Sequence, residues 1–406
     1  MAAFGDASGL QLNAAKSKAL ALGAWDTEAS TIAFPYVPST RILGVVFSPK
    51  SSQLPQLNWP VITAAASAVL RDNCSRSLCI EQRVRFVNTF AMSKLWYVAK
   101  VVPPLLRVVQ GMRTAVGRFV WTGWLFRVPF PVLCSSLGSG GFGLHDPVLR
   151  CKALFYSRWK SIQAESPTTF SGAYLSSLED TSTETVNSQR PCTYFVPYKE
   201  VKNVAPQDTN LMGNVLTRLV YSILLPLLLP GKPRIESVLP NTEWSTVWQN
   251  VQSRFLLQNA RSLWFAAVHD IFASNDRLFR IGRLTTDKCC NCGRWDTILH
   301  RIVSCGHAAD IWRWVKDTLQ VALSLPPEFL HQDFPIRPDT KISDKKKHNT
   351  TIWLTGHVIM AILNEKQAPT LDSVINNTLK PIRSHVLTHS QKYIEKKYGT
   401  YLEALF

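Results

Sequence analysis

Four of the nine cysteines in this chain of 406 residues lie within 17 positions, and this cluster constrains the fold more than any other feature of the sequence. They occur as Cys289-Cys290-Asn291-Cys292 and as Cys305, with His300 between the two groups. Read from Cys289, the spacing is Cys-x2-Cys-x7-His-x4-Cys. Two cysteines separated by two residues can hold one metal ion from a tight turn, and a His and a Cys can complete a tetrahedron. The spacing therefore predicts a metal site with four ligands.

Three thiolates and one imidazole suit Zn²⁺, and four protein ligands leave no open coordination position, so we expect a structural zinc. Cys290 is an alternative to Cys289 as the first ligand, and His307 is a weaker alternative to Cys305. In the competing interpretation the cysteines hold no metal and are ordinary core residues. Polar neighbours argue against a core position, namely Lys288, Asn291, Gly293, Arg294 and Asp296.

The formal net charge of +17 predicts a polyanionic partner, either nucleic acid or an anionic membrane surface. We expect no membrane span, because the most apolar stretch, Ile223–Pro230, is short and contains two prolines. We also expect no secretory signal, because Met1–Asp6 has no basic segment followed by an apolar run. Without an export signal, the odd number of cysteines favours reduced thiols in an intracellular compartment.

Basic side chains are concentrated around the cysteine cluster, which suits contact with phosphate groups. A solvated basic face with no partner is the alternative interpretation. These residues are Arg277, Arg280, Arg283, Lys288, Arg294 and Arg301.

Apolar residues recur every three or four positions in three segments, which predicts amphipathic helices that begin near Arg83, Leu256 and Ala308. Pro103-Pro104 should end the first. Short strands are expected at Thr31–Phe34 and Arg41–Phe47. The fold class is therefore mostly α, with a small α/β piece at the N-terminus. The expected segments are 1–50, a helical region 51–175, a polar linker 176–210 that includes Ser176–Pro191, a zinc-binding helical region 211–324, a loop 325–349, and C-terminal helices 350–406.

Two motifs resemble functional sites, but their surroundings argue against that function. Gly138–Gly143 matches Gly-x-Gly-x-x-Gly, yet prolines flank it and no acid lies about 20 residues on, so we expect a tight turn rather than a dinucleotide site. His385 and His389 lie four residues apart without a metalloprotease glutamate between them, so we expect exposed helical histidines. The residues alone show no catalytic constellation.

Several short segments, taken in order, resemble reverse transcriptases of non-LTR (LINE-like) retrotransposons, which are RNA-directed DNA polymerases of transposable elements. The resemblance covers about residues 4–155 and 255–315. Phe4 with Ser8–Ser17 resembles the end of the palm, and Arg41–Val45 resembles the hairpin that follows it. The segments that resemble the thumb, the connection and the element beyond it are Asn58-Trp59, Arg83-Val84 with Asn88, Ser93–Tyr97, Phe119–Trp121 and Gly140–Leu144 with Asp146. Those that match the family's C-terminal zinc-binding region are Trp264, His269-Asp270, Arg277-Leu278, the set Cys289, Cys292, His300 and Cys305, and Trp312.

The resemblance implies a nucleic-acid-binding C-terminal portion of such an enzyme, with RNA and DNA as partners and a nuclear location. Arg83, Arg85 and Lys94 would contact the backbone of the template and primer. Lys16 would be an auxiliary proton donor. The carboxylates that bind Mg²⁺ in the intact family polymerase would precede residue 1, so we expect this chain to be inactive alone.

Two alternatives remain open. The chain can be a portion of a longer active polymerase whose start was assigned too late. It can also be a zinc-stabilised adaptor that binds other proteins, with its charge serving only solubility.

Overall fold

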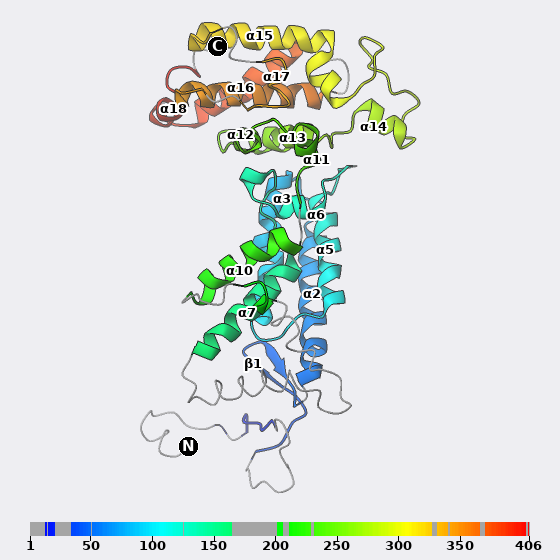
Figure 1. The fold of residues 1–406 in the computed structure, drawn as a ribbon, viewed down its shortest axis with the longest axis vertical. Helices are drawn as coiled ribbons and strands as arrows, with labels where there is room; N and C mark the ends of the chain where they lie inside the picture. Colours follow the sequence, from blue (N-terminus) through cyan, green and yellow to red (C-terminus); the bar gives the residue numbers. More distant parts are fainter. Residues whose placement is uncertain are drawn as a thin grey trace. The chain divides into compact units, whose positions relative to one another are not determined.

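Helices dominate the computed structural model (Figure 1). The mostly α fold class is confirmed, with one two-stranded sheet near the N-terminus. Within the described ranges, no helix combines the length and apolar character needed to span a bilayer. The structure describes residues 13, 15–20, 34–49, 51–124, 126–164, 201–205, 211–228, 231–326, 331–339, 342–365, 370–402 and 405.

The chain forms two compact units, and each combines three separated segments. The sequence predicts segments that are each continuous along the chain. It cannot predict these units, because composition along a chain does not report contacts between distant helices. Residues 31–33 of the first expected strand and the polar segment Ser176–Pro191 lie outside the described residues. The first unit comprises residues 1–75, 87–119 and 145–229, and the second comprises 76–86, 120–144 and 230–406.

A β-hairpin in the first unit confirms the strands expected around Arg41–Phe47. Strands β1 (Thr40–Ile42) and β2 (Val45–Phe47) pair antiparallel. Leu43 and Gly44 form the turn with φ values of 48° and 89°, the left-handed region that a tight hairpin turn requires. Asn58 fixes the hairpin to the following helix, since its amide exchanges two hydrogen bonds of 2.8 Å with the backbone of Val46.

The helix expected from Arg83 is present but is divided by a π-helical turn. Ile80–Phe86 (α3), Val87–Ala91 (η2) and Ser93–Ala99 (α4) follow one another, and the backbone N–H of Met92 donates to Val87 O at 2.9 Å. The predicted apolar stripe is buried throughout, at Val84, Val87, Ala91, Leu95, Val98 and Val102.

A buried carboxylate, Asp146, connects three helices of the first unit. It accepts hydrogen bonds from the Arg113 guanidinium at 2.6 and 3.0 Å and from Leu149 N at 2.8 Å, while its own N–H donates to Tyr221 Oη at 2.8 Å. Asp146 thereby joins three helices, and α7 lies beside α10 (Figure 1). The remaining helices of this unit are η1 (Ser51–Gln53), α2 (Leu54–Asp72), α5 (Leu106–Val120), α7 (Pro147–Ala164) and α10 (Gly213–Leu228).

The glycine motif lies in the second unit and forms a tight turn, as expected. A Cβ at Gly141 would meet Ser135 O at 2.1 Å, so no larger residue fits there. The carbonyl of Gly140 accepts a hydrogen bond of 3.0 Å from His269 Nε2. The His269 ring stacks on Trp248 with centroids 4.8 Å apart. A short helix, not a strand, precedes the motif, which is not the setting of a dinucleotide site.

Three helices of the second unit, α16, α17 and α18, form the C-terminal part of the chain, as expected from the sequence. Of these, α16 packs against α13, α17 and α18, and a Cβ at Gly356 would meet Leu256 Cδ2 at 2.4 Å. His385 differs from the expectation of exposure, because it is half-buried against Trp353 with ring centroids 5.4 Å apart. The other bounds are α6 (Phe130–Cys134), η3 (Leu137–Ser139), α11 (Arg234–Val238), α12 (Trp244–Val251), α13 (Gln258–Val268), α14 (Asn275–Arg280), η4 (His300–Ser304), α15 (Gly306–Leu323), α16 (Lys345–Asn364), α17 (Leu371–Thr388) and α18 (Gln391–Tyr398).

The buried His357 predicts a loss of stability in acid. Burial lowers its pKa from 6.5 to about 4, although the hydrogen bond of 2.7 Å from Nδ1 to Trp353 O opposes the shift. Between these pH values the unfolded chain binds a proton that the folded chain does not, so the free energy of unfolding falls as pH falls. The contribution is about 1.4 kcal/mol per pH unit. Urea unfolding across this range should show a shallower pH slope for His357→Gln than for wild type. An unchanged slope in His357→Gln would contradict this account.

Candidate metal centre

The first two cysteines of the cluster lie on a tight turn closed by backbone hydrogen bonds. Cys289 N donates to Arg294 O at 2.7 Å, and Gly293 N donates to Cys289 O at 3.0 Å. Gly293 has a φ of 70°, a conformation that glycine adopts without strain. Lys288 and Trp295 form an antiparallel bridge on either side of this turn. The turn presents two thiols from nearby backbone positions.

The other two candidate ligands lie at the start of a helix. His300 opens the π-helical turn η4, and its N–H donates to Thr297 Oγ1 at 3.1 Å. Cys305 is the N-cap of α15, and its N–H donates to His300 O at 2.8 Å. These bonds fix the spacing between the imidazole and the third thiol.

The four predicted side chains converge. The donor atoms of Cys289, Cys292, His300 and Cys305 all lie within 4.8 Å of one another. The Sγ atoms of Cys289 and Cys305 are 3.9 Å apart, and Cys292 Sγ lies 3.2 Å from His300 Nε2. A tetrahedral zinc with bonds of about 2.3 Å to sulfur and 2.0 Å to nitrogen separates its ligand atoms by about 3.5–3.8 Å. The group can hold a metal ion, and it is compatible with structural zinc.

The structure also distinguishes between the alternative ligands that the sequence left open. Cys290 is exposed, and its nearest polar contact is Asn291 Oδ1 at 3.6 Å. His307 is also exposed. Neither belongs to the converging group, whereas Cys289, His300 and Cys305 are buried.

The surroundings of Cys289, His300 and Cys305 shift the pKa values of these three side chains. Burial raises the pKa of Cys305 to about 11, and the neighbouring Cys289 adds to this rise. Burial also raises the pKa of Cys289, but N–H groups of Asn291 and Cys292 outweigh it and bring that pKa below its usual value. Burial lowers the pKa of His300, which favours the neutral imidazole that a metal requires. A divalent cation would stabilise the thiolates by its charge.

Asp296 connects the parts of this module, and the sequence analysis missed it. Its carboxylate is 2% exposed, accepts Asn275 N at 3.0 Å and Arg301 Nε at 3.2 Å, and forms an ion pair with Arg301. Its backbone N–H donates to Asp287 O at 2.9 Å. The side chain and the backbone of this one residue thus join the start of α14, the cysteine turn and the His300 turn. Its position among basic residues was the only signal in the sequence.

Some of the residues predicted to contact nucleic acid are buried or engaged by other side chains, and the others are exposed. Arg83 is 6% exposed and donates to the carbonyls of Leu78 and Arg76 at 2.9 and 3.1 Å, so we no longer propose it as a phosphate contact. Arg301 is largely occupied by Asp296. Arg277 lies over the Phe126 ring at 4.5 Å. The exposed residues of the predicted set are Arg85 and Arg280, each paired with an acid on its own helix, and Lys94, Arg283, Lys288 and Arg294.

Lys16, the expected auxiliary proton donor, is exposed beside a turn. Its N–H donates to both the backbone and the side-chain oxygen of Asn13 at 3.1 Å.

Comparison with known proteins found no protein-family model and no curated protein that matches this chain.

The converging ligands predict the metal content of single variants. Wild type should bind about one zinc per chain, and Cys292→Ser should weaken binding by more than the roughly 10–100-fold that loss of an outer-shell partner causes. Cys290→Ser is the matched control and should retain the metal, because the Cys290 thiol lies outside the group. Elemental analysis after dialysis measures both. Loss of metal from Cys290→Ser, or retention in Cys292→Ser, would reject this ligand set.

Asp296→Ala should destabilise the same module. Removal of the carboxylate leaves the partly buried Arg301 unpaired, which costs about 3–5 kcal/mol. Asp310→Ala removes the partner of an exposed arginine and should cost about 0–1 kcal/mol. Hydrogen exchange of residues 274–305 compares the two variants. Equal protection in both would show that Asp296 does not organise the module.

Proposed function

We propose that this chain binds single-stranded or template–primer nucleic acid through a zinc-ordered module, as the C-terminal part of a non-LTR retrotransposon reverse transcriptase. The ordered sequence resemblances support the family, and the converging three thiols and one imidazole support a structural zinc. Zinc in a closed site would order the surrounding backbone rather than take part in catalysis.

The observation that carries the proposal is an exposed tryptophan among cations beside the cysteine turn. Trp295 is 65% exposed, and the Lys288 ammonium lies 5.4 Å from the centre of its ring. Arg294, also exposed, is its neighbour in sequence. We name Lys288, Arg294 and Trp295 the knuckle face.

The knuckle face has the chemistry of a sequence-tolerant nucleic-acid surface. Residues 277–301 contain six basic and two acidic side chains. Cations bind phosphates without reading sequence, and an exposed indole can stack on any base.

A zinc-stabilised adaptor is the second candidate, because apolar side chains are also exposed in this region. Phe279 and Ile281 are 45% and 48% exposed. An adaptor would bind its partner through such side chains, with an affinity largely indifferent to salt.

Charge reversal of the knuckle face tests the proposal. The double variant Lys288→Glu, Arg294→Glu should weaken binding to single-stranded RNA and lower the slope of log affinity against log salt by about 0.7 for each lost phosphate contact. Trp295→Ala should cost about 1–3 kcal/mol without changing that slope. Filter binding at several salt concentrations gives both values.

The control is Lys392→Glu, Lys396→Glu on α18, which changes net charge equally at exposed positions. If the control loses as much affinity as the knuckle variant, the knuckle face is not the contact surface. If the affinity of the wild-type chain does not change with salt concentration, the result would support the zinc-stabilised adaptor instead.

A further inference from the structure

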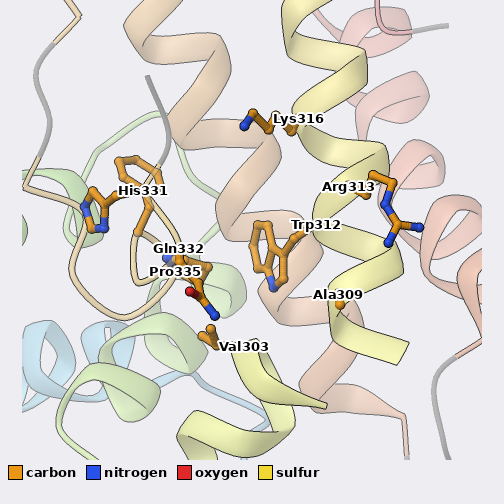
Figure 2. Close-up of a pocket in the computed structure, with 9 residues that line it drawn as sticks. Val303, Ala309, Trp312, Arg313, Lys316, His331, Gln332 and Pro335 are labelled. Carbon is orange, nitrogen blue, oxygen red and sulfur yellow. The ribbon is translucent and has the colours of Figure 1, made fainter. Parts of the chain in front are cut away.

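A pocket of about 350 Å³ lies next to the candidate metal centre, between α15 and the segment 331–335. Trp312 and Lys316 project from α15 toward His331 and Gln332 on the facing segment (Figure 2). Val303 and Pro335 contribute apolar walls. The volume is at the lower end of the range for small-ligand sites, about 300–1,000 Å³, so it suits one ring system rather than a folded partner.

Trp312 is held in a fixed orientation. Its indole Nε1 donates to Ile302 O at 2.5 Å, which satisfies the only polar atom of the ring. The ring also packs against the cluster of Cys289, Cys305 and Ala308. The polar edge and one side of the indole are therefore committed to the metal module, while the ring also lines the pocket.

The charge at the pocket is positive and incompletely paired. Arg313 pairs with Asp310 at 2.8 Å, and its side chain extends away from His331 (Figure 2). His331 Nε2 contacts Asp339 at 2.9 Å. No described carboxylate pairs with Lys316, so its ammonium is available to an anion beside the indole. Gln332 is exposed at the rim and offers both a donor and an acceptor.

We infer that this pocket binds one unpaired nucleotide, with the base against Trp312 and its phosphate on Lys316. The inference deepens the proposed function and rests on it. A flat aromatic group with an attached anion matches an aromatic wall beside an unpaired ammonium. A base inside a duplex is stacked on both faces and cannot enter, so the pocket selects single strands or free nucleotides.

The pocket should depend on the metal centre. Val303 lies between His300 and Cys305 in the chain, and Trp312 packs against the cluster formed by Cys289, Cys305 and Ala308. Loss of the metal would free these side chains and remove one wall of the pocket.

The test compares a short uridine oligonucleotide with an abasic strand that carries the same number of phosphates. It uses the full chain with Trp295→Ala, so that stacking on the knuckle face does not contribute. We expect the strand with bases to bind at least about 5-fold tighter, since stacking on one aromatic ring is worth about 1–3 kcal/mol. Ala309→Leu, which fills the pocket from an exposed position of α15, should abolish this preference while zinc content stays unchanged.

Two lysine variants separate pocket binding from general charge. Lys316→Gln should weaken both strands several-fold, whereas Lys380→Gln, at an exposed position on α17, should have no effect. Uridine monophosphate that competes away the base preference would show that a free nucleotide also enters. Equal binding of the two strands, or a preference that survives Ala309→Leu, would overturn the pocket. If binding is still salt-sensitive in that case, the proposed function stands. If neither strand binds, both proposals fail.

Discussion

Three sulfur atoms and one ring nitrogen lie within 4.8 Å of one another, on side chains that are all buried except Cys292, and this end of the molecule depends on their convergence. Burial and the neighbouring Cys289 raise the pKa of Cys305, and a shared divalent cation would stabilise the Cys305 thiolate. The cysteine turn, the π-helical turn η4 and the start of α15 each supply part of the set. Their relative positions, and therefore those of Trp295 and Trp312, follow from one coordination site.

The convergence of Cys289, Cys292, His300 and Cys305 could be predicted from their spacing, because residues so close in sequence can reach a common point in space. The choice between Cys289 and Cys290 could not, because the hydrogen bond from Cys289 N to Arg294 O and the exposure of the Cys290 side chain exist only in the folded turn. Asp296 escaped prediction for a related reason. Its carboxylate accepts a hydrogen bond from Asn275 N, 21 residues away in the sequence, and no local sequence pattern predicts such a contact.

The helices were predictable because their buried stripes repeat every three or four residues, as in α15. The surroundings of individual side chains were less predictable from the sequence. Arg83 borders the apolar stripe on a helical wheel, yet it is buried and its guanidinium donates to carbonyl groups of the preceding loop. His385 was expected in solvent, but α16 places Trp353 against it. The composition of the two units also could not be predicted from the sequence, because each unit combines segments that are separated by tens of residues.

The central claim is that a bound metal orders the surface that contacts nucleic acid. The most direct test measures the affinity of the purified chain for single-stranded RNA before and after the metal is removed with a chelator, and again after zinc is restored. The account predicts at least a 10-fold loss on removal and full recovery on restoration, since the aromatic contacts of about 1–3 kcal/mol each depend on the ordered module. An affinity unchanged by chelation, with the metal shown to be gone, would contradict it.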